Sequence, residues 1–144
     1  MPGGSIGEAH NFATRVRYAD TDAMGIVYNA VYLVWFEVGR TEWLRALGMP
    51  YSEVEARGMS LPVVEASLRF LSGARYDDLV EIETRLREVR SRRIVFDYRI
   101  CVGVRLLAEG STTHVPVEIA TGRTVRIPDW LNRALGVRAA VRAP

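Results

Sequence analysis

The chain has 144 residues, of which 49% are hydrophobic and 25% charged, and its formal net charge is +2. A chain of this length fits a single domain, residues 1–144, that buries roughly two thirds of its unfolded surface without a disulfide or metal. The small net charge argues against a nucleic-acid partner, and no apolar run approaches the ~18 residues of a membrane-spanning helix, which argues against membrane insertion.

Cysteine usage bears on the compartment. Cys101 is the single cysteine, so an intrachain disulfide is impossible, and the first residues do not form a charged-then-apolar leader. Both observations favour a reducing environment, and we expect a cytoplasmic protein.

The chain begins with a tail, a strand and a long helix. Glycine and proline predict a flexible tail over residues 1–10, and alternating side chains predict a first strand over residues 12–18. Residues 29–47 predict a long helix with Asn29 as its N-cap and with Gly48 and Pro50 ending it. Apolar residues cover nearly the whole circumference of its first half, so this helix must be surrounded.

Only strands are expected between this helix and a short closing helix at residues 128–135. Apolar and polar residues alternate over residues 64–70, 80–87, 94–100 and 106–112. The order predicts an α+β fold in which a curved antiparallel five-stranded sheet, with the last four strands as a meander, wraps one central helix. Such a sheet leaves an edge or face uncovered, so we expect a homodimer.

The segment from Tyr18 to Asn29, YADTDAMGIVYN, brings carboxylates close to a helix start. N–H groups in the first turn of a helix lack intrahelical partners and lie at the positive end of the dipole, so they can stabilise a developing negative charge. An aspartate there can act as a base or a nucleophile. The same residue type also caps turns, and we assign that structural role to Asp20.

The longer stretch from Tyr18 to Glu37, YADTDAMGIVYNAVYLVWFE, resembles the signature of the hotdog-fold acyl-CoA thioesterases, in particular the 4-hydroxybenzoyl-CoA thioesterase and YbgC-type branch. Weaker matches are Val63-Val64-Glu65-Ala66, Ala74-Arg75-Tyr76-Asp77-Asp78, and Thr121-Gly122-Arg123 leading to Ile127-Pro128. The resemblance implies a hotdog fold, a homodimer that assembles into a homotetramer, and hydrolysis of acyl-CoA to free acid and CoA. It implies no cofactor beyond the CoA of the substrate.

Carried over position by position, the resemblance places the catalytic carboxylate on Asp22. Four further residues would polarise the carbonyl or position the substrate: Gly25, Val27, Tyr28 and Asn29. The backbone amides near the last two would hold the oxyanion, and the glycine would allow a tight bend and close approach.

The turn Arg90-Ser91-Arg92-Arg93 is the candidate site for the CoA phosphates, because guanidinium groups bind phosphates bidentately. Within it we assign CoA binding to Ser91, Arg92 and Arg93. A solvated hairpin with scattered charges produces the same pattern. Arg75 and Arg123 are weaker candidates.

No metal site is expected. The string DTDAMG begins like a calcium loop, but Met24 and Val31 stand where that loop needs oxygen ligands. Two distant histidines and one cysteine do not make a zinc site either, and we expect His114 to end a strand as a structural residue.

Two other functions fit the same pattern. A non-catalytic acyl-CoA-binding or regulatory module would keep the fold and bind the ester without turnover. A hydratase of enoyl thioesters would need a histidine near the helix start, and the segment from Tyr18 to Asn29 has none. The acyl group and the choice between CoA and acyl carrier protein stay open.

Overall fold

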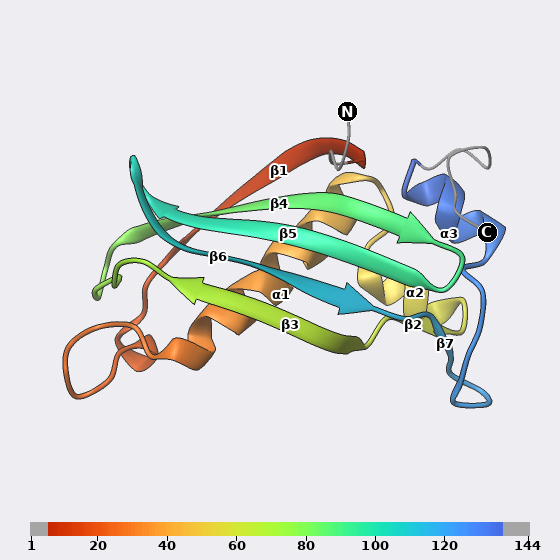
Figure 1. The fold of residues 1–144 in the computed structure, drawn as a ribbon, viewed down its shortest axis with the longest axis horizontal. Helices are drawn as coiled ribbons and strands as arrows, with labels where there is room; N and C mark the ends of the chain where they lie inside the picture. Colours follow the sequence, from red (N-terminus) through yellow and green to blue (C-terminus); the bar gives the residue numbers. More distant parts are fainter. Residues whose placement is uncertain (1–5, 137–144) are drawn as a thin grey trace.

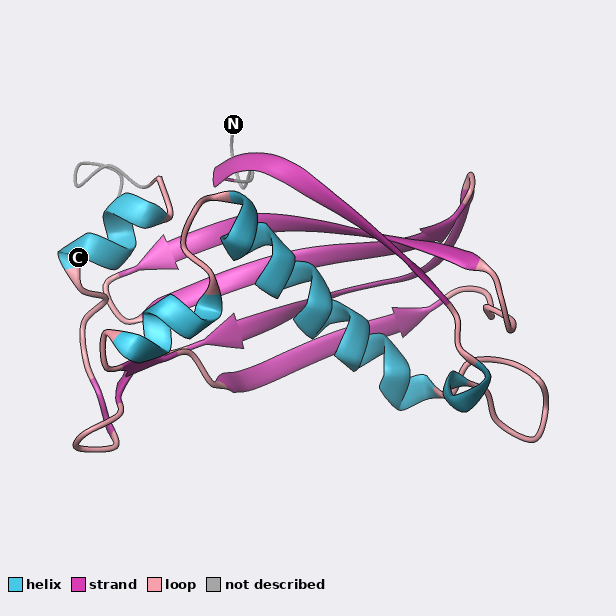
Figure 2. Cartoon of the chain, turned by 180° about the vertical axis from the view of Figure 1, so that it is seen from behind, coloured by secondary structure: helices cyan, strands magenta, loops and turns pink. Residues whose placement is uncertain are grey.

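A computed structural model describes residues 6–136 and shows one long helix lying across a curved antiparallel sheet (Figures 1 and 2). The helix is α1 (Asn29–Ala46). The five strands of the sheet are β1 (Ile6–Arg15), β3 (Val63–Phe70), β4 (Leu79–Arg90), β5 (Arg93–Val102) and β6 (Arg105–His114). The α+β hotdog architecture expected from the sequence is thereby confirmed.

Smaller elements gather mainly at one end of the sheet (Figure 1). They are the helices α2 (Tyr51–Ala56) and α3 (Asp129–Ala134) and a three-stranded sheet of β2 (Met59–Ser60), β7 (Val117–Glu118) and β8 (Arg123–Thr124). At the opposite end, a single 3-10 turn, η1 (Tyr18–Asp20), precedes the loop that enters α1. The closing helix α3 was predicted, whereas α2 contradicts the expectation of strands alone.

The strand order β1-β4-β5-β6-β3 corrects the predicted meander. Strands β4, β5 and β6 do follow one another, but β3 pairs with β6 at the far edge, and β1 takes the place beside β4. The chain can cross from one edge to the other because residues 71–78 form a loop between β3 and β4. Both edge strands, β1 and β3, therefore have one side without a strand partner in the described chain.

The N-terminal boundaries also differ from the prediction. Strand β1 begins at Ile6, inside the predicted tail, because the 12-residue β4 offers main-chain partners up to Leu86. It ends at Arg15, since the following residues turn into η1. Residues 1–5 of the predicted tail lie outside the described residues. At the helix, Tyr28 is the N-cap and Asn29 is the first helical residue, so the predicted cap was one residue late.

Helix α1 packs on the sheet through aromatic side chains. Phe36 is fully buried and stacks on Tyr98 of β5, with ring centroids 4.2 Å apart and an interplanar angle of 7°. Gly110 of β6 makes room for this pair, because a Cβ there would lie 2.8 Å from the Phe36 ring and 2.2 Å from the Ser67 carbonyl oxygen. Gly39 similarly lets α1 approach Thr84 of β4.

The other side of α1 is not covered by residues 6–136. Leu33 and Val34 are 42% and 52% exposed, and the neighbouring edge strand β3 exposes Val63 and Val64 by 42% and 57%. The predicted enclosure of the helix is therefore incomplete in the described residues, and an apolar strip runs along α1 and β3.

Candidate functional site

The loop from Thr21 to Val27 is closed on itself before α1 begins. Its two ends pair as an isolated antiparallel bridge, and Ile26 forms a second bridge with Arg75 of the β3–β4 loop. Gly25 sits at the bend with a φ of +80°, a conformation that glycine adopts at no steric cost. The predicted role of Gly25 in the tight turn agrees with this geometry.

Asp22 is exposed, and its carboxylate has a defined direction. The Met24 N–H donates to Asp22 Oδ1 at 2.8 Å, while the Asp22 N–H donates to the Ile26 carbonyl oxygen at 2.9 Å. Within residues 6–136 no protein group binds the second carboxylate oxygen. The loop thus holds one oxygen of the carboxylate and leaves the other open to solvent.

At the start of α1, some backbone N–H groups donate hydrogen bonds within the protein and others do not. The Val27 N–H donates to the Ala74 carbonyl oxygen and the Tyr28 N–H to that of Asp20, both at 2.9 Å. The next amides, of Asn29 and Ala30, have no backbone acceptor in the described chain. Among the residues predicted to polarise a carbonyl, Asn29 alone therefore has an available N–H, and Ala30 joins it.

Asp20 has the structural role expected from the sequence. Its side chain is 5% exposed and accepts from the Arg17 N–H and from the Arg17 guanidinium, both at 2.8 Å. Burial alone would raise the pKa of Asp20, but the hydrogen bonds from Arg17 outweigh burial and lower the pKa. Because the Asp20 carbonyl also binds the Tyr28 N–H, this residue ties η1 to the start of the helix.

The predicted CoA-binding turn lies at the opposite end of the sheet from Asp22 (Figure 1). Strand β4 begins beside Arg15 and runs 12 residues to the turn, about 36 Å at 3.3 Å per residue. In this turn Arg93 binds Glu88, as does Arg90, and these bonds lower the pKa of Glu88. Among residues 6–136, Arg92 is bound only by a 3.4 Å contact to the Thr124 carbonyl oxygen, so its cation is the most available in this turn.

Comparison with known proteins identifies the family. Residues 16–135 match the model of the thioesterase-like superfamily. The chain belongs to this superfamily. It is 34% identical over 120 residues to a putative acyl-CoA thioesterase, YneP, from Bacillus subtilis, covering 80% of this chain and 87% of that protein. It is 33% identical over 125 residues to the acyl-CoA thioesterase YbgC of Haemophilus influenzae, covering 86% and 92%.

Solved structures agree with the assignment. A hypothetical protein from Thermus thermophilus is 44% identical and superposes with a TM-score of 0.84, covering 88% of this chain and 96% of that one. Together with its named relatives, this places the chain among the hotdog-fold thioester hydrolases. The resemblance to the YbgC-type branch that the sequence indicated is confirmed.

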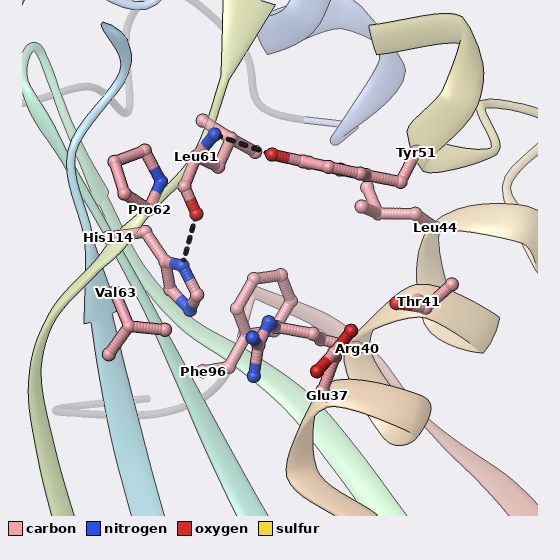
Figure 3. A pocket seen from close by; sticks show the side chains of 10 residues that line it. All are labelled: Glu37, Arg40, Thr41, Leu44, Tyr51, Leu61, Pro62, Val63, Phe96 and His114. Carbon is pink, nitrogen blue, oxygen red and sulfur yellow. Dashed lines mark hydrogen bonds between the residues drawn. The ribbon is translucent and has the colours of Figure 1, made fainter. Parts of the chain in front are cut away.

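The chain also contains a cavity that the sequence did not predict. Figure 3 shows it between α1, α2, the segment before β3 and the sheet. Its volume is about 280 Å³. The lining residues are Glu37, Arg40, Thr41, Leu44, Tyr51, Leu61, Pro62, Val63, Phe96 and His114. They come from segments up to 77 residues apart in the sequence, so no local pattern predicts the cavity. Glu37 is exposed at its edge.

A chain of hydrogen bonds lies behind the wall of this cavity. His114 Nδ1 lies 2.8 Å from the Leu61 carbonyl oxygen and therefore carries the proton, which leaves Nε2 to accept from Thr112 Oγ1 at 2.8 Å. The Tyr98 hydroxyl then donates to Thr112 Oγ1 at 2.6 Å. His114 ends β6 and is 1% exposed, so its predicted structural role is confirmed.

Stability is expected to fall between pH 6.5 and pH 4 because of His114. Burial lowers the pKa of His114 from 6.5 to about 4, and the Arg40 charge acts in the same direction against the bond to Leu61. Below pH 6.5 His114 binds a proton in the unfolded chain but not in the folded chain. The free energy of unfolding is therefore lower by about 3 kcal/mol at pH 4. Urea titrations at pH 7 and pH 4.5 measure this loss. A His114→Gln variant removes the titrating group, and an equal acid loss in that variant contradicts the assignment.

Among residues 6–136 no group of three or more His, Cys, Asp or Glu side chains is placed to hold a metal ion. No helix in the same residues is long and apolar enough to cross a membrane.

Proposed function

We propose that the chain hydrolyses acyl-CoA thioesters at the start of α1, with Asp22 as the catalytic carboxylate. The observation that carries the proposal is the exposed, oriented carboxylate of Asp22 in a loop that leads directly to the unpaired amides of Asn29 and Ala30. The names of the relatives YneP and YbgC support CoA esters as the substrate class.

The reaction needs a polarised carbonyl and an activated nucleophile. A carbonyl oxygen over the helix start would accept from the Asn29 amide, and each good donor can stabilise the oxyanion by about 3 kcal/mol. Asp22 would either take a proton from an attacking water or attack the carbon itself. Collapse of the tetrahedral intermediate breaks the C–S bond and releases CoA as a thiolate, which takes up a proton. In the nucleophilic route, water then hydrolyses the anhydride between the acyl group and Asp22.

The distance between Asp22 and the Arg92 turn supports a complete site that two chains build together. Strand β3 runs from Val63, beside the turn end of the sheet, to Phe70, beside the Asp22 end. Antiparallel pairing of this free edge with β3 of a second copy would bring the basic turn of one chain to the Asp22 end of the other. The same pairing would cover Val63 and Val64, the part of the apolar strip that lies on β3. CoA would then run along the interface.

The assembly proposed is this homodimer, paired further into a homotetramer in the cytoplasm. Sizing chromatography with light scattering should give two or four times the chain mass of 16.2 kDa. A mass equal to one chain under assay conditions would contradict the shared site.

The activity is tested by free-thiol release from a panel of aliphatic and aromatic acyl-CoA esters. The proposal predicts saturable release that is proportional to enzyme concentration. Tight binding of the esters, measured by calorimetry, without thiol release would instead support the non-catalytic binding module. Loss of the double bond of an enoyl-CoA without thiol release would support a hydratase.

The role of Arg92 is tested by comparing two substrates that share one acyl group. We expect Arg92→Gln to raise KM for acyl-CoA about 10-fold, since a charge-assisted phosphate contact is lost, with kcat little changed. The acyl-pantetheine ester lacks the nucleotide and should keep its KM. An Arg99→Gln variant on β5 is the matched control. Equal effects on both substrates would contradict nucleotide recognition by this turn.

A further inference from the structure

The cavity beside the C-terminal half of α1 presents hydrogen-bond donors against an apolar wall. Leu44, Leu61 and Phe96 supply the apolar part. The Tyr51 hydroxyl accepts from the Leu61 N–H at 2.9 Å, and its own proton has no acceptor within residues 6–136. Arg40 also lines the cavity. A ligand group that fits here must therefore accept hydrogen bonds.

Arg40 is the principal donor because no carboxylate of residues 6–136 pairs with it. None of the ion pairs in the described part of the chain includes it, although they engage most of its other arginines. Arg40 is partly buried, and its guanidinium donates a hydrogen bond to the Tyr98 hydroxyl behind the wall. The five N–H donors of a guanidinium exceed what this one contact can use. A partly buried cation that faces a cavity without a counter-ion is a receptor for an anion.

The buried polar groups around Arg40 cannot satisfy it. His114 is neutral, and both of its ring nitrogens are used, one by the Leu61 carbonyl and one by Thr112. The Tyr98 and Thr112 hydroxyls point along the same chain of bonds. Glu37, one turn earlier on α1, is the only carboxylate of the described residues that lines the cavity, and its exposure leaves it solvated and screened.

A groove leads from this cavity toward the start of the helix. It is lined by Leu33, Val34, Glu37, Arg40, Val63, Ala66 and Thr112, and it shares three of these residues with the cavity. Its apolar end lies one turn beyond Asn29, where the thioester carbonyl is proposed to bind. From Asn29 to Arg40 the helix rises about 16 Å, the length of an extended acyl chain of about 12 to 14 carbons.

We propose that the cavity binds the far end of the acyl group and that Arg40 selects acyl chains ending in a carboxylate. The substrates are then CoA monoesters of dicarboxylic acids, with the methylene chain along Leu33 and Val34 and the terminal carboxylate on the Arg40 guanidinium. This inference rests on the proposed thioesterase function for the position of the carbonyl, while the anion-binding cavity stands on its own geometry.

The test compares matched pairs of CoA esters, a monocarboxylic and a dicarboxylic acyl group of equal length, from 4 to about 14 carbons. At the best length, the wild-type protein should hydrolyse the dicarboxylic ester with at least a 10-fold higher kcat/KM. Arg40→Gln should remove this preference by lowering kcat/KM for the dicarboxylic ester about 10-fold, with less than a twofold change for its partner. Arg40→Lys keeps the charge and should restore part of the preference. No preference at any length, or an equal loss on both esters, overturns the proposal.

Glu37→Gln is the matched control on the same helix. Removing the neighbouring negative charge should raise kcat/KM for the dicarboxylic ester by two- to threefold, opposite to the effect of Arg40→Gln. A lower value would contradict recognition of the acyl carboxylate by the charge of Arg40. Thermal unfolding of each variant checks that the fold is retained.

Calorimetry with the free dicarboxylate of the best length separates this inference from the proposed function. Binding to wild type that is lost in Arg40→Gln supports the cavity even if no ester is hydrolysed. Hydrolysis of esters without Arg40-dependent binding overturns the cavity and leaves the thioesterase proposal intact.

Discussion

Replacing Asp22 by asparagine should lower kcat for acyl-CoA hydrolysis by roughly 10²- to 10⁴-fold, the range that a positioned acid–base group contributes. Asparagine has nearly the same shape, and its side-chain oxygen can still accept the Met24 N–H, so the loop should keep its conformation. It cannot take a proton from water or act as a carboxylate nucleophile. The loss should therefore fall on kcat while the binding of acyl-CoA is retained.

Asp20→Asn provides the matched control two residues away. Asp20 is buried and bound by Arg17, so its replacement should lower the midpoint of thermal unfolding. The activity of the molecules that remain folded should stay within a few-fold of wild type. Undiminished turnover in Asp22→Asn, or an equal loss of turnover in both variants, would contradict the assignment of Asp22 as the catalytic carboxylate.

The second large effect concerns the core. Phe36→Ala should lower the free energy of unfolding by about 3 to 5 kcal/mol, because removing a fully buried phenylalanine loses its transfer free energy and leaves a cavity. The lost ring also leaves Tyr98 without its stacking partner and opens the space that Gly110 keeps clear. Urea unfolding followed by fluorescence and circular dichroism measures the change.

Val104→Ala is the control for this truncation. Val104 lies in the turn between β5 and β6 and is fully exposed, so its truncation should change the free energy of unfolding by less than about 0.5 kcal/mol. A loss of under about 1 kcal/mol in Phe36→Ala would show that the helix does not depend on this contact.

The parts of the fold that rest on local patterns could be predicted from the sequence. The helix ends where Gly48 adopts a φ of +85°, a conformation that favours glycine, and the alternation of β4 and β5 matches their buried and exposed faces. Helix α2 was missed because Pro50, taken only as a stop, is also the N-cap of the next helix. The place of β3 beside β6 was missed because strand neighbours are chosen by tertiary packing.

Only the part of the candidate site that lies in one continuous segment could be predicted from the sequence. Asp22 and Gly25 lie in one continuous segment, so their proximity to the helix start follows from the sequence. Which amides are free does not follow, since Val27 and Tyr28 are bound by residues outside their own turn. The cavity at Arg40 depends on α2 and on His114, far away in the chain. Its only local signal was a polar group, Glu37 with Arg40 and Thr41, directly after the apolar first half of the helix.

A crystal structure of Asp22→Asn with an unhydrolysed acyl-CoA would show where the thioester binds. We expect the thioester carbonyl oxygen about 2.7 to 3.2 Å from the Asn29 backbone nitrogen, with the carbonyl carbon facing residue 22. A thioester bound away from the start of α1, with no contact to the Asn29 amide, would contradict it.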